Sequence, residues 1–387
     1  MTPAAIALPR LVHIGAGALD RLGSVIATLG VHRPVVVTDR FMVESGVAQR
    51  VMDLLVAAGT TPALFDGTVP DPTTDSLGPG LDAVRAAHAD AVVGLGGGSP
   101  IDTAKALSVL YANGGTMTDY RAPGPYTGPA LPIVAIPTTA GSGSEATQFT
   151  VITDSVTDEK MLCPGLSFLP VATIVDVDLT MTMPARLSAD TGVDALTHAI
   201  EAYVSRKANP VSDGLAVAAM RTIAGALRRV YADGTDRDAR AAMMVAATQA
   251  GMAFSNASVA LVHGMSRPIG GHFHVAHGLS NAMLLPAVTR FSVDAALDRY
   301  ADCARAMRIV TDSADDRTAA YALVDELTCL CADVEVPTPA THGIDADAWA
   351  ARLPVMAEQA LASGSPANNP RVPDADEIVA LYQQIYR

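Results

Sequence analysis

The sequence predicts an α/β domain built on a parallel sheet, followed by a domain that is nearly all α. Up to about residue 180, short β-branched runs alternate with Ala-rich helical segments, which is typical of a parallel sheet covered by helices. Beyond residues 180–188 the strand signals vanish and amphipathic helical segments continue to the C-terminus. With 387 residues, half of them apolar, the chain is long enough for two cores. We therefore predict domains over residues 1–183 and 184–387.

Each element of the first domain is predicted from a short apolar run or an Ala-rich segment bounded by Gly, Pro, Asp or Thr. The turn-rich segments 66–80 and 121–129 are expected to connect elements at the rim of the sheet. The predicted strands are residues 11–15, 34–39, 61–65, 91–96, 131–137 and 171–178, and the predicted helices are residues 17–29, 40–58, 75–88 and 100–112.

Composition excludes several classes of function. The chain carries 26 basic and 40 acidic residues, a formal charge of −14, and no Lys/Arg run, so we expect no nucleic-acid partner. No apolar stretch approaches the roughly 18 to 20 residues that span a bilayer, and the N-terminal segment lacks the pattern of a secretory leader. Cys163, Cys303, Cys329 and Cys331 lack zinc or CxxC spacing, so we expect buried free thiols and a cytoplasmic protein without membrane partners.

A glycine-rich turn follows the predicted strand 91–96. Gly96, Gly97 and Gly98 allow a tight turn and let a ligand approach the backbone amides, and the helix that follows offers unpaired N–H groups to a phosphate. The alternative is a tight strand-to-helix turn without a ligand. The strand–GGGS–helix context favours phosphate binding.

The start of that helix has a predicted cap. Ser99 stands where an N-cap is expected, Pro100 where the first helical residue is expected, and Asp102 would complete an S-x-x-D capping box.

Three other segments of the first domain are candidate contacts of a cofactor. The Gly15-Ala-Gly17 turn lacks the third glycine of G-x-G-x-x-G, so we interpret it as structural. Asp39 ends the second predicted strand, where it could accept bonds from an adenosine ribose and repel a 2′-phosphate, or could equally cap the next helix. The segment 136–147 is rich in hydroxyl residues; composition alone indicates no more than a flexible loop.

A candidate metal centre lies in the second domain. Asp194 and His198 are four residues apart on a predicted helix and therefore share a face. His263 falls on a later helix and His277 at the start of the next. One carboxylate and three imidazoles suit Fe²⁺ or Zn²⁺. The alternative for each histidine is a packed or surface side chain.

Other polar residues lie near these four in the sequence. His272 and His274 precede His277 and could compete as ligands, although we place them among residues around the metal or the substrate. Glu201 comes one helical turn after His198, where it could accept a bond from a ligand or face solvent.

Four segments together resemble the iron-containing (group III) alcohol dehydrogenases: GGGSPIDTAKA, PTTAGSGSEAT, DALTHAIEAY and HGMSRPIGGHFHVAHGLSNAMLLP. The resemblance covers most of the chain between residues 90 and 286. It implies a Rossmann-like N-terminal domain that binds a dinucleotide and a helical C-terminal domain, as in the dehydroquinate-synthase-like fold. It also implies a homodimer.

The resemblance assigns roles to matching residues. It implies that Asp194, His198, His263 and His277 are the metal ligands, with Fe²⁺ expected and Zn²⁺ possible. It implies that NAD contacts the glycine-rich loop, the hydroxyl loop, an acid that favours NAD and a lysine near the nicotinamide ribose; the matching residues are Gly96, Gly97, Gly98, Ser99, Asp102, Thr138, Thr139, Ser142, Asp39 and Lys160.

One position departs from the family pattern. Many members have His-x-x-x-His-Pro where this chain has His263 followed by Arg267 and Pro268. A guanidinium does not shuttle protons near neutral pH but can bind a carboxylate in a bidentate manner. Our hypothesis is that Arg267 favours aldehydes with an acidic or hydroxyl group; the alternative is a structural ion pair. His274 is then a candidate for the proton relay, beside water and a ribose hydroxyl.

The resemblance implies hydride transfer between NAD and a small primary alcohol or aldehyde at a divalent metal. Two related activities are alternatives. A reductase of the maleylacetate type would work without the metal set, and a lyase of the dehydroquinate synthase type would need a Lys/Arg cluster that the sequence does not show. A non-catalytic NAD-binding protein is a third alternative.

Overall fold

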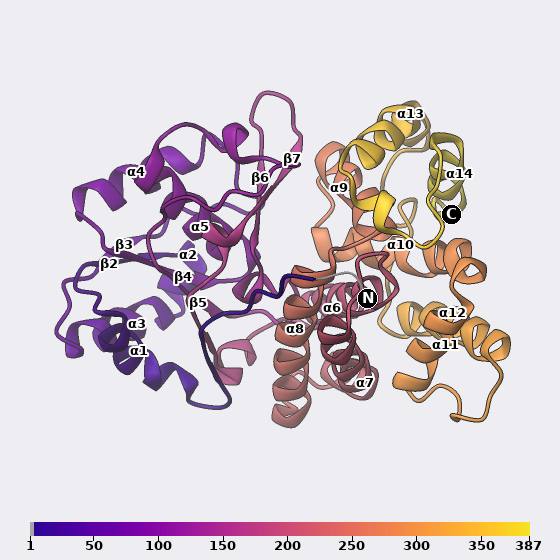
Figure 1. Cartoon of the computed structure of the whole chain (residues 1–387), viewed down its shortest axis with the longest axis horizontal. Helices are drawn as coiled ribbons and strands as arrows, with labels where there is room; N and C mark the ends of the chain where they lie inside the picture. The colour runs from indigo at the N-terminus through magenta and orange to yellow at the C-terminus, as the bar shows by residue number, and fades with distance from the viewer. Residues whose placement is uncertain (1–3) are drawn as a thin grey trace. The chain divides into compact units, whose positions relative to one another are not determined.

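The computed structural model describes residues 4–387, which divide into two compact units. The first unit, Ala7–Thr182, contains every strand and is α/β. The second, Met183–Arg387, is helical, and residues 4–6 group with it. Figure 1 shows the strands in the indigo-to-magenta part of the chain and the helical unit in the rose, orange and yellow part. The predicted fold class is confirmed.

The sheet of the first unit has six parallel strands in the order β1-β8-β5-β4-β2-β3. All six overlap the runs that the sequence predicts. Their bounds are β1 Leu11–Ile14, β2 Pro34–Val37, β3 Ala63–Phe65, β4 Ala91–Gly96, β5 Ile133–Pro137 and β8 Ala172–Val175.

Helices cover both faces of this sheet because successive strand residues point to opposite sides. Val36 and Val93 share one apolar cluster with residues of α1 and α3, whereas Val35 and Val92 share the other with residues of α4 and α5. The helices of this unit are α1 Leu22–Leu29, α2 Arg40–Glu44, α3 Val47–Ala57, α4 Leu77–Ala86 and α5 Gly98–Asn113, with 3₁₀ turns η1 Ala18–Arg21, η2 Met117–Tyr120, η3 Ser144–Ala146, η4 Leu166–Phe168 and η5 Val177–Thr180.

A two-stranded antiparallel hairpin, which the sequence analysis missed, is added to this framework. It consists of β6, Phe149–Thr153, and β7, Lys160–Pro164. Both strands alternate between buried and partly buried residues, as expected for strands with one covered face. The hairpin packs its β6 strand against α5.

The helical unit is organised around α6, Ala185–Val204, which packs against α7, α8 and α10. Most of its residues are buried, as expected for a helix covered on several sides. The remaining helices are α7 Pro210–Ala232, α8 Arg237–Ala257, α9 Leu261–Phe273, α10 His277–Ser292, α11 Leu297–Ala306, α12 Asp316–Asp333, α13 Ala346–Ala362 and α14 Ala375–Ile385, with 3₁₀ turns η6 Val293–Ala295 and η7 Ser365–Asn368.

Close backbone approach brings the start of α10 against α6. A Cβ added at Gly278 would lie 2.6 Å from the carbonyl oxygen of Asp190, so this contact requires glycine. The approach places His277, the residue before this glycine, beside the face of α6 that carries Asp194.

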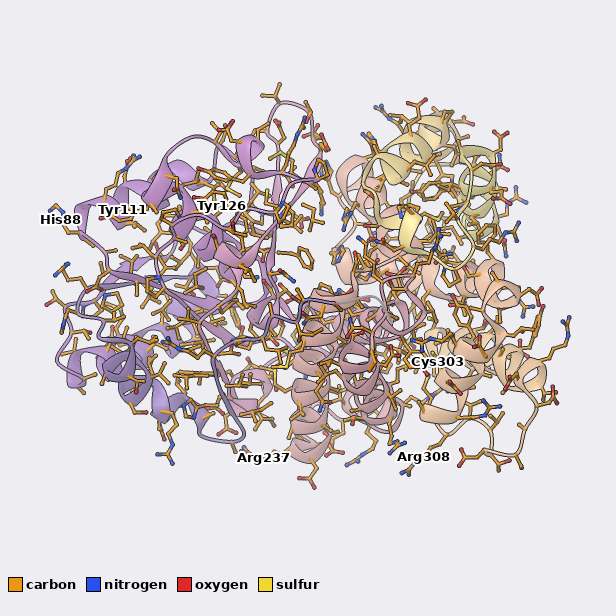
Figure 2. The ribbon with its side chains drawn as sticks, viewed as in Figure 1. His88, Tyr111, Tyr126, Arg237, Cys303 and Arg308 are labelled. Atoms are coloured by element: carbon orange, nitrogen blue, oxygen red, sulfur yellow. The ribbon has the colours of Figure 1, made fainter. Side chains whose placement is uncertain are left out.

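The cysteines match the expectation in all but one case. Cys163, Cys303 (Figure 2) and Cys331 are buried, and all four thiols are free. Burial raises the pKa of the Cys163 thiol to about 12, which makes it unreactive. Cys329 is exposed, contrary to the prediction, because it falls on the outer face of α12.

Among the described residues, no single helix is long and apolar enough to cross a membrane. Helices α8 and α9 together have the required length and composition, but they are bent by 104° at the break between them.

Candidate metal centre

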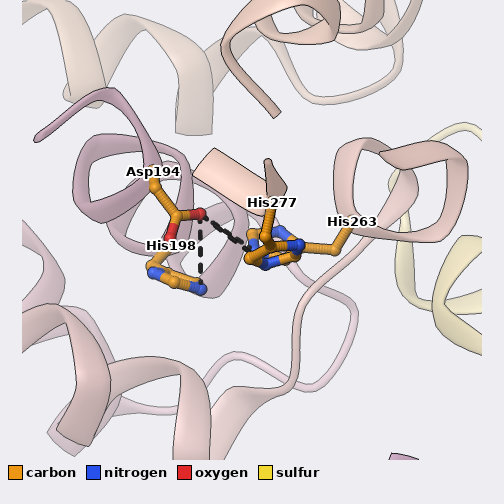
Figure 3. Close-up of side chains that lie close together, drawn as sticks. All are labelled: Asp194, His198, His263 and His277. Atoms are coloured by element: carbon orange, nitrogen blue, oxygen red, sulfur yellow. Dashed lines mark ion pairs between the residues drawn. The ribbon is translucent and has the colours of Figure 1, made fainter. Parts of the chain in front are cut away.

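Four side chains from three helices converge in the helical unit. Asp194 and His198 lie on α6, His263 on α9 and His277 at the start of α10 (Figure 3). One potential ligand atom from each lies within 4.8 Å of the others. The Nε2 atoms of His198, His263 and His277 lie 3.8, 3.6 and 3.9 Å from Asp194 Oδ1.

This arrangement fits a divalent cation. Protein ligands hold Fe²⁺ or Zn²⁺ at about 2.1 Å, so a cation can bridge atoms up to about 4.2 Å apart. The three distances to Asp194 are within that limit. Three of the side chains are almost fully buried, whereas His277 is 38% exposed. The cluster is therefore open to solvent at His277.

Glu201 orients one of the imidazoles. Its Oε2 accepts a bond from His263 Nδ1 at 2.6 Å, and its Oε1 accepts one from the backbone N–H of Val262 at 2.6 Å. With its proton on Nδ1, His263 presents the Nε2 lone pair toward Asp194, as a metal ligand must. Of the two alternatives weighed for Glu201, the structure shows the buried acceptor and not the solvated side chain.

Electrostatics at the cluster favours a bound cation. Burial alone would raise the pKa of Asp194, but the three histidines hold it far below the ordinary value. Burial opposes the charged form of His263, but Glu201 and Asp194 together raise the pKa of its imidazole. The Asp194 carboxylate thus remains ionised among the imidazoles, where a cation would offset its buried negative charge.

Sequence reasoning missed two residues that contact the cluster. Phe254 on α8 stacks on the His198 ring, with centroids 4.1 Å apart. Asn281, one turn after His277 on α10, donates from Nδ2 to Asp194 Oδ1 at 2.7 Å. The spacing of Asn281 from His277 could have indicated it, since residues four apart share a helix face. Nothing in the sequence pattern links Phe254 to His198.

Arg267 lies one turn after His263 on α9 and is partly buried. Its Nη1 donates to Ser365 Oγ at 3.1 Å, the only bond it makes within the described residues. The structural ion pair that we weighed as an alternative is therefore not formed there. Burial lowers the pKa of the guanidinium to about 10, although Glu201 partly offsets this effect.

His272, in the last turn of α9, and His274, the C-cap of that helix, are not among the potential metal ligands. His272 Nε2 bonds to Gln359 Oε1 at 2.9 Å. His274 is exposed and ends α9 in the left-handed conformation, with φ of 54°. Neither is a potential metal ligand, in line with the expectation that they surround the metal or the substrate, and the proton-relay role of His274 stays a prediction.

In the first unit, the glycine-rich loop lies directly beside the hydroxyl loop. A Cβ at Gly97 would meet Thr139 at 3.3 Å, and one at Gly98 would meet Ser142 at 3.3 Å. The N–H of Thr138 donates to the Gly96 carbonyl at 2.9 Å. The structure thus brings together the two loops that the sequence analysis singled out separately.

The predicted cap of α5 is wrong. The helix begins at Gly98 with Gly97 as N-cap and no side-chain cap, so Ser99 is already helical. Glycine at these positions lets the helix begin under the neighbouring loop, which leaves its first amides without a capping side chain. Asp102 is partly buried and instead accepts from Ser144 Oγ at 2.5 Å and from the Val151 N–H at 3.0 Å.

Asp71 joins the glycine loop to the hairpin. Lys160 Nζ lies 2.9 Å from Asp71 Oδ1, and the Asp71 N–H donates to Ser99 Oγ at 3.3 Å. Lys160 is thereby held near the start of α5.

Two other turns are fixed by carboxylates. Asp39 caps α2 by accepting from the Met42 N–H at 3.0 Å. The Gly15–Gly17 turn is structural, as expected: the buried Asp176 carboxylate accepts from the N–H groups of Gly17 and Leu19 at 3.1 and 2.9 Å.

Both units match models of the same protein family. A family model described as iron-containing alcohol dehydrogenase matches residues 9–177, and one described as the C-terminal part of the Fe-containing alcohol dehydrogenase family matches residues 188–386. The chain therefore belongs to the iron-containing alcohol dehydrogenase family and is an alcohol dehydrogenase or aldehyde reductase of that type. The matches cover both units, so this interpretation stands over the two related activities that we weighed.

Individual relatives are similar along the whole chain. Lactaldehyde reductase of Escherichia coli K12 is 38% identical over 371 residues, which cover 95% of this chain and 96% of the relative. A solved 1,3-propanediol oxidoreductase superposes with a TM-score of 0.94 at 35% identity, covering 99% and 100% of the two chains. Sulfoacetaldehyde reductase from Bifidobacterium kashiwanohense, solved in complex with NAD⁺, gives 0.88 at 26% identity, covering 100% and 99%.

Proposed function

We propose that the protein transfers hydride between NAD(H) and a small primary alcohol or aldehyde, using a divalent cation held by Asp194, His198, His263 and His277. The convergence of these four side chains carries the proposal. Fe²⁺ is the cation that the family suggests, and Zn²⁺ suits the same donors.

A bound cation supplies Lewis acidity, which lowers the pKa of an alcohol or polarises an aldehyde carbonyl. The protein's own residues prepare that step. Glu201 fixes the His263 tautomer, and the buried Asp194 contributes a negative charge that stays ionised. His277, the partly exposed member, marks the side from which a substrate oxygen reaches the centre.

Support for NAD comes from the two adjacent loops of the first unit. The uncapped N-terminus of α5 offers backbone N–H groups to a pyrophosphate. The hydroxyl groups of Thr138, Thr139 and Ser142 lie in the neighbouring loop, and Lys160 is held nearby by Asp71. Asp39 remains our candidate for discrimination against a 2′-phosphate while it caps α2. The sulfoacetaldehyde reductase bound to NAD⁺ supports this cofactor by similarity.

We propose that the aldehyde carries a hydroxyl or acidic substituent. Arg267 follows His263 by one turn and donates to the Ser365 hydroxyl, without a carboxylate partner among the described residues. A partly buried guanidinium that bonds to one neutral hydroxyl and to no carboxylate keeps further N–H donors for an acidic or hydroxyl substituent of the substrate.

We also propose a cytoplasmic homodimer. Three buried free thiols and one exposed free thiol suit a reducing compartment. Strand β1 forms one edge of the sheet, and its Val12 and Ile14 side chains are 37% and 46% exposed. An exposed apolar edge strand is a ready pairing surface for a second copy.

The test is an NAD-linked assay over short alcohols and hydroxy-substituted aldehydes, using protein stripped of metal and reloaded separately with Fe²⁺ or Zn²⁺. We expect turnover only after reloading and at least a hundredfold lower kcat in His263→Ala. A stripped protein that works as well as the reloaded one would contradict the proposal.

A further inference from the structure

The Asn281 amide lies against three of the four potential ligands. Its Nδ2 is 2.7 Å from Asp194 Oδ1, 3.1 Å from His263 Nε2 and 3.3 Å from His277 Nε2. The residue is fully buried. These three atoms are acceptors, and an amide NH₂ offers two hydrogens to them.

The other end of the same amide has no partner. Asn281 Oδ1 is buried and accepts no hydrogen bond within the described part of the chain. A buried carbonyl without a donor is rare in native proteins and calls for an explanation. In this orientation Oδ1 of Asn281 has no hydrogen-bond donor, but the NH₂ group faces the potential ligand atoms.

We propose that Asn281 is a positioning residue of the metal centre: its NH₂ holds Asp194 and separates the converging lone pairs of the centre, so that the ligands are ordered before a cation binds. This inference rests on the proposed metal site. It assigns to Asn281 a role in cation affinity, and it assigns no step of hydride transfer to it.

The sign of its effect follows from the strengths of its contacts. The bond to Asp194 is charge-assisted and is roughly twice as strong as the neutral contacts to the imidazoles. The contacts to the imidazoles must break when a cation binds to them. The bond to Asp194 remains, and it orients that carboxylate both with and without the cation. Loss of the amide should therefore weaken cation binding, as the loss of groups that orient metal ligands generally does.

The test measures cation affinity directly, by competition of Zn²⁺ and Fe²⁺ with a chelator and by the shift in melting temperature on adding each metal. We expect Asn281→Leu, which keeps the number and branching of the side-chain heavy atoms but removes the donor, to bind about 10 to 100 times more weakly. Asn281→Ser serves as the milder replacement if the leucine variant does not fold. Asn369→Leu is the matched control, because it removes a buried amide of the same unit that bonds to Ser292 and the Arg371 carbonyl instead.

Asn281→Asp separates positioning from mere space filling. It places a second carboxylate beside Asp194, so the metal-free protein should melt at a lower temperature while cation affinity equals or exceeds that of the wild type. The inference would be overturned if the leucine variant bound the cation within twofold of the wild-type affinity. It would also be overturned if the aspartate variant lost as much cation affinity as the leucine variant is expected to lose. Because affinity is measured without turnover, an enzyme inactive with every alcohol would overturn the proposed function and leave this result intact.

Discussion

At the scale of single residues, the potential ligand atoms of the cluster are oriented by side chains that are not potential ligands themselves. Glu201 carries a buried charge to the far side of the His263 ring. We expect Glu201→Gln to weaken Zn²⁺ or Fe²⁺ binding by about tenfold or more, because the neutral amide is a weaker acceptor for Nδ1–H. Chelator competition measures this. Glu358→Gln on α13, an exposed position, is the control; equal affinity in both variants would show that Glu201 has no such role.

Arg267 sets a second prediction at this scale. In Arg267→His we expect kcat/KM for a carboxylated aldehyde to fall about 10- to 100-fold, since a hydrogen bond to a charged group contributes about 1.5–3 kcal/mol. The value for a neutral aldehyde of similar length should change less than about threefold by the same argument, because no charged group is lost. Steady-state kinetics on both substrates gives the comparison. An unchanged preference would contradict a role in substrate choice.

Individual residues also show which parts of the candidate site could be predicted from the sequence. The spacing of Asp194 and His198 predicts a shared helix face. The places of His263 and His277 on later predicted helices made them candidate ligands, and the family resemblance then implied that role for both. His274 could not be assigned because a single left-handed residue reverses the chain there. Asn281 and Phe254 act through contacts across helices, for which local patterns carry no signal.

At the scale of elements, turns were predicted less well than strands. Strands in the core of a parallel sheet are continuous apolar runs, and all six were found from that signal. The start of α5 was misplaced because Ser99 matches a cap motif, whereas the space beneath Thr139 and Ser142 requires the glycines to begin the helix. The hairpin was missed because its two strands alternate in burial but not in sequence: FTVIT and KMLCP lack a regular alternation of apolar and polar residues.

The Asp176 carboxylate holds the turn that follows β1, and we expect its loss to lower the stability of the protein. It accepts from Gly17, Leu19 and Asp178, so Asp176→Ala leaves three backbone donors without their acceptor. We expect a loss of about 3 kcal/mol in the free energy of unfolding, measured with urea. Formate at high concentration should restore part of it. Asp90→Ala, whose contacts to His32 and Arg33 are exposed, should cost about 1 kcal/mol or less; equal losses would argue against the role of burial.

Lys105 gives a pH prediction for the junction of α5 and β6. Its buried ammonium donates to the carbonyls of Thr147 and Phe149, and burial lowers its pKa to about 8 even though Asp102 and Glu145 oppose this. The unfolded chain keeps this proton up to its ordinary value of 10.5. Between these values the unfolded state binds more protons, so the stability should rise with pH by about 3 kcal/mol.

The measurement is urea unfolding from pH 7.5 to 10.5 for the wild type and for Lys105→Met. The wild type should gain stability relative to the variant across this window. Parallel curves would show that Lys105 does not titrate in the folded protein in this range.

At the scale of the whole molecule, the residues proposed to bind the cation and those proposed to bind NAD belong to different units. The four potential metal ligands all lie in Met183–Arg387, and the glycine and hydroxyl loops lie in Ala7–Thr182. A cation at 100 times its Kd should add about 2.7 kcal/mol to the stability of the state that binds it. We expect the cation to slow amide hydrogen exchange in α6, α9 and α10, and NAD to slow it at the N-terminus of α5. Mass spectrometry of exchanged peptides checks this; a cation that protects only the first unit would contradict the assignment.

The C-terminal segment braces the helix that carries His263. Asn368 Nδ2 donates to Ser258 Oγ and to the Val259 carbonyl just before α9, and Ser365 accepts from Arg267. Pro366 lies so close to Gly264 that a Cβ there would be 2.8 Å from its ring. During synthesis, the last of the four ligands leaves the ribosome 88 residues (365 − 277) before this brace begins. A chain truncated before residue 365 would therefore still carry all four potential ligands, but α9, the helix that bears His263, would lack these contacts to Ser365, Pro366 and Asn368.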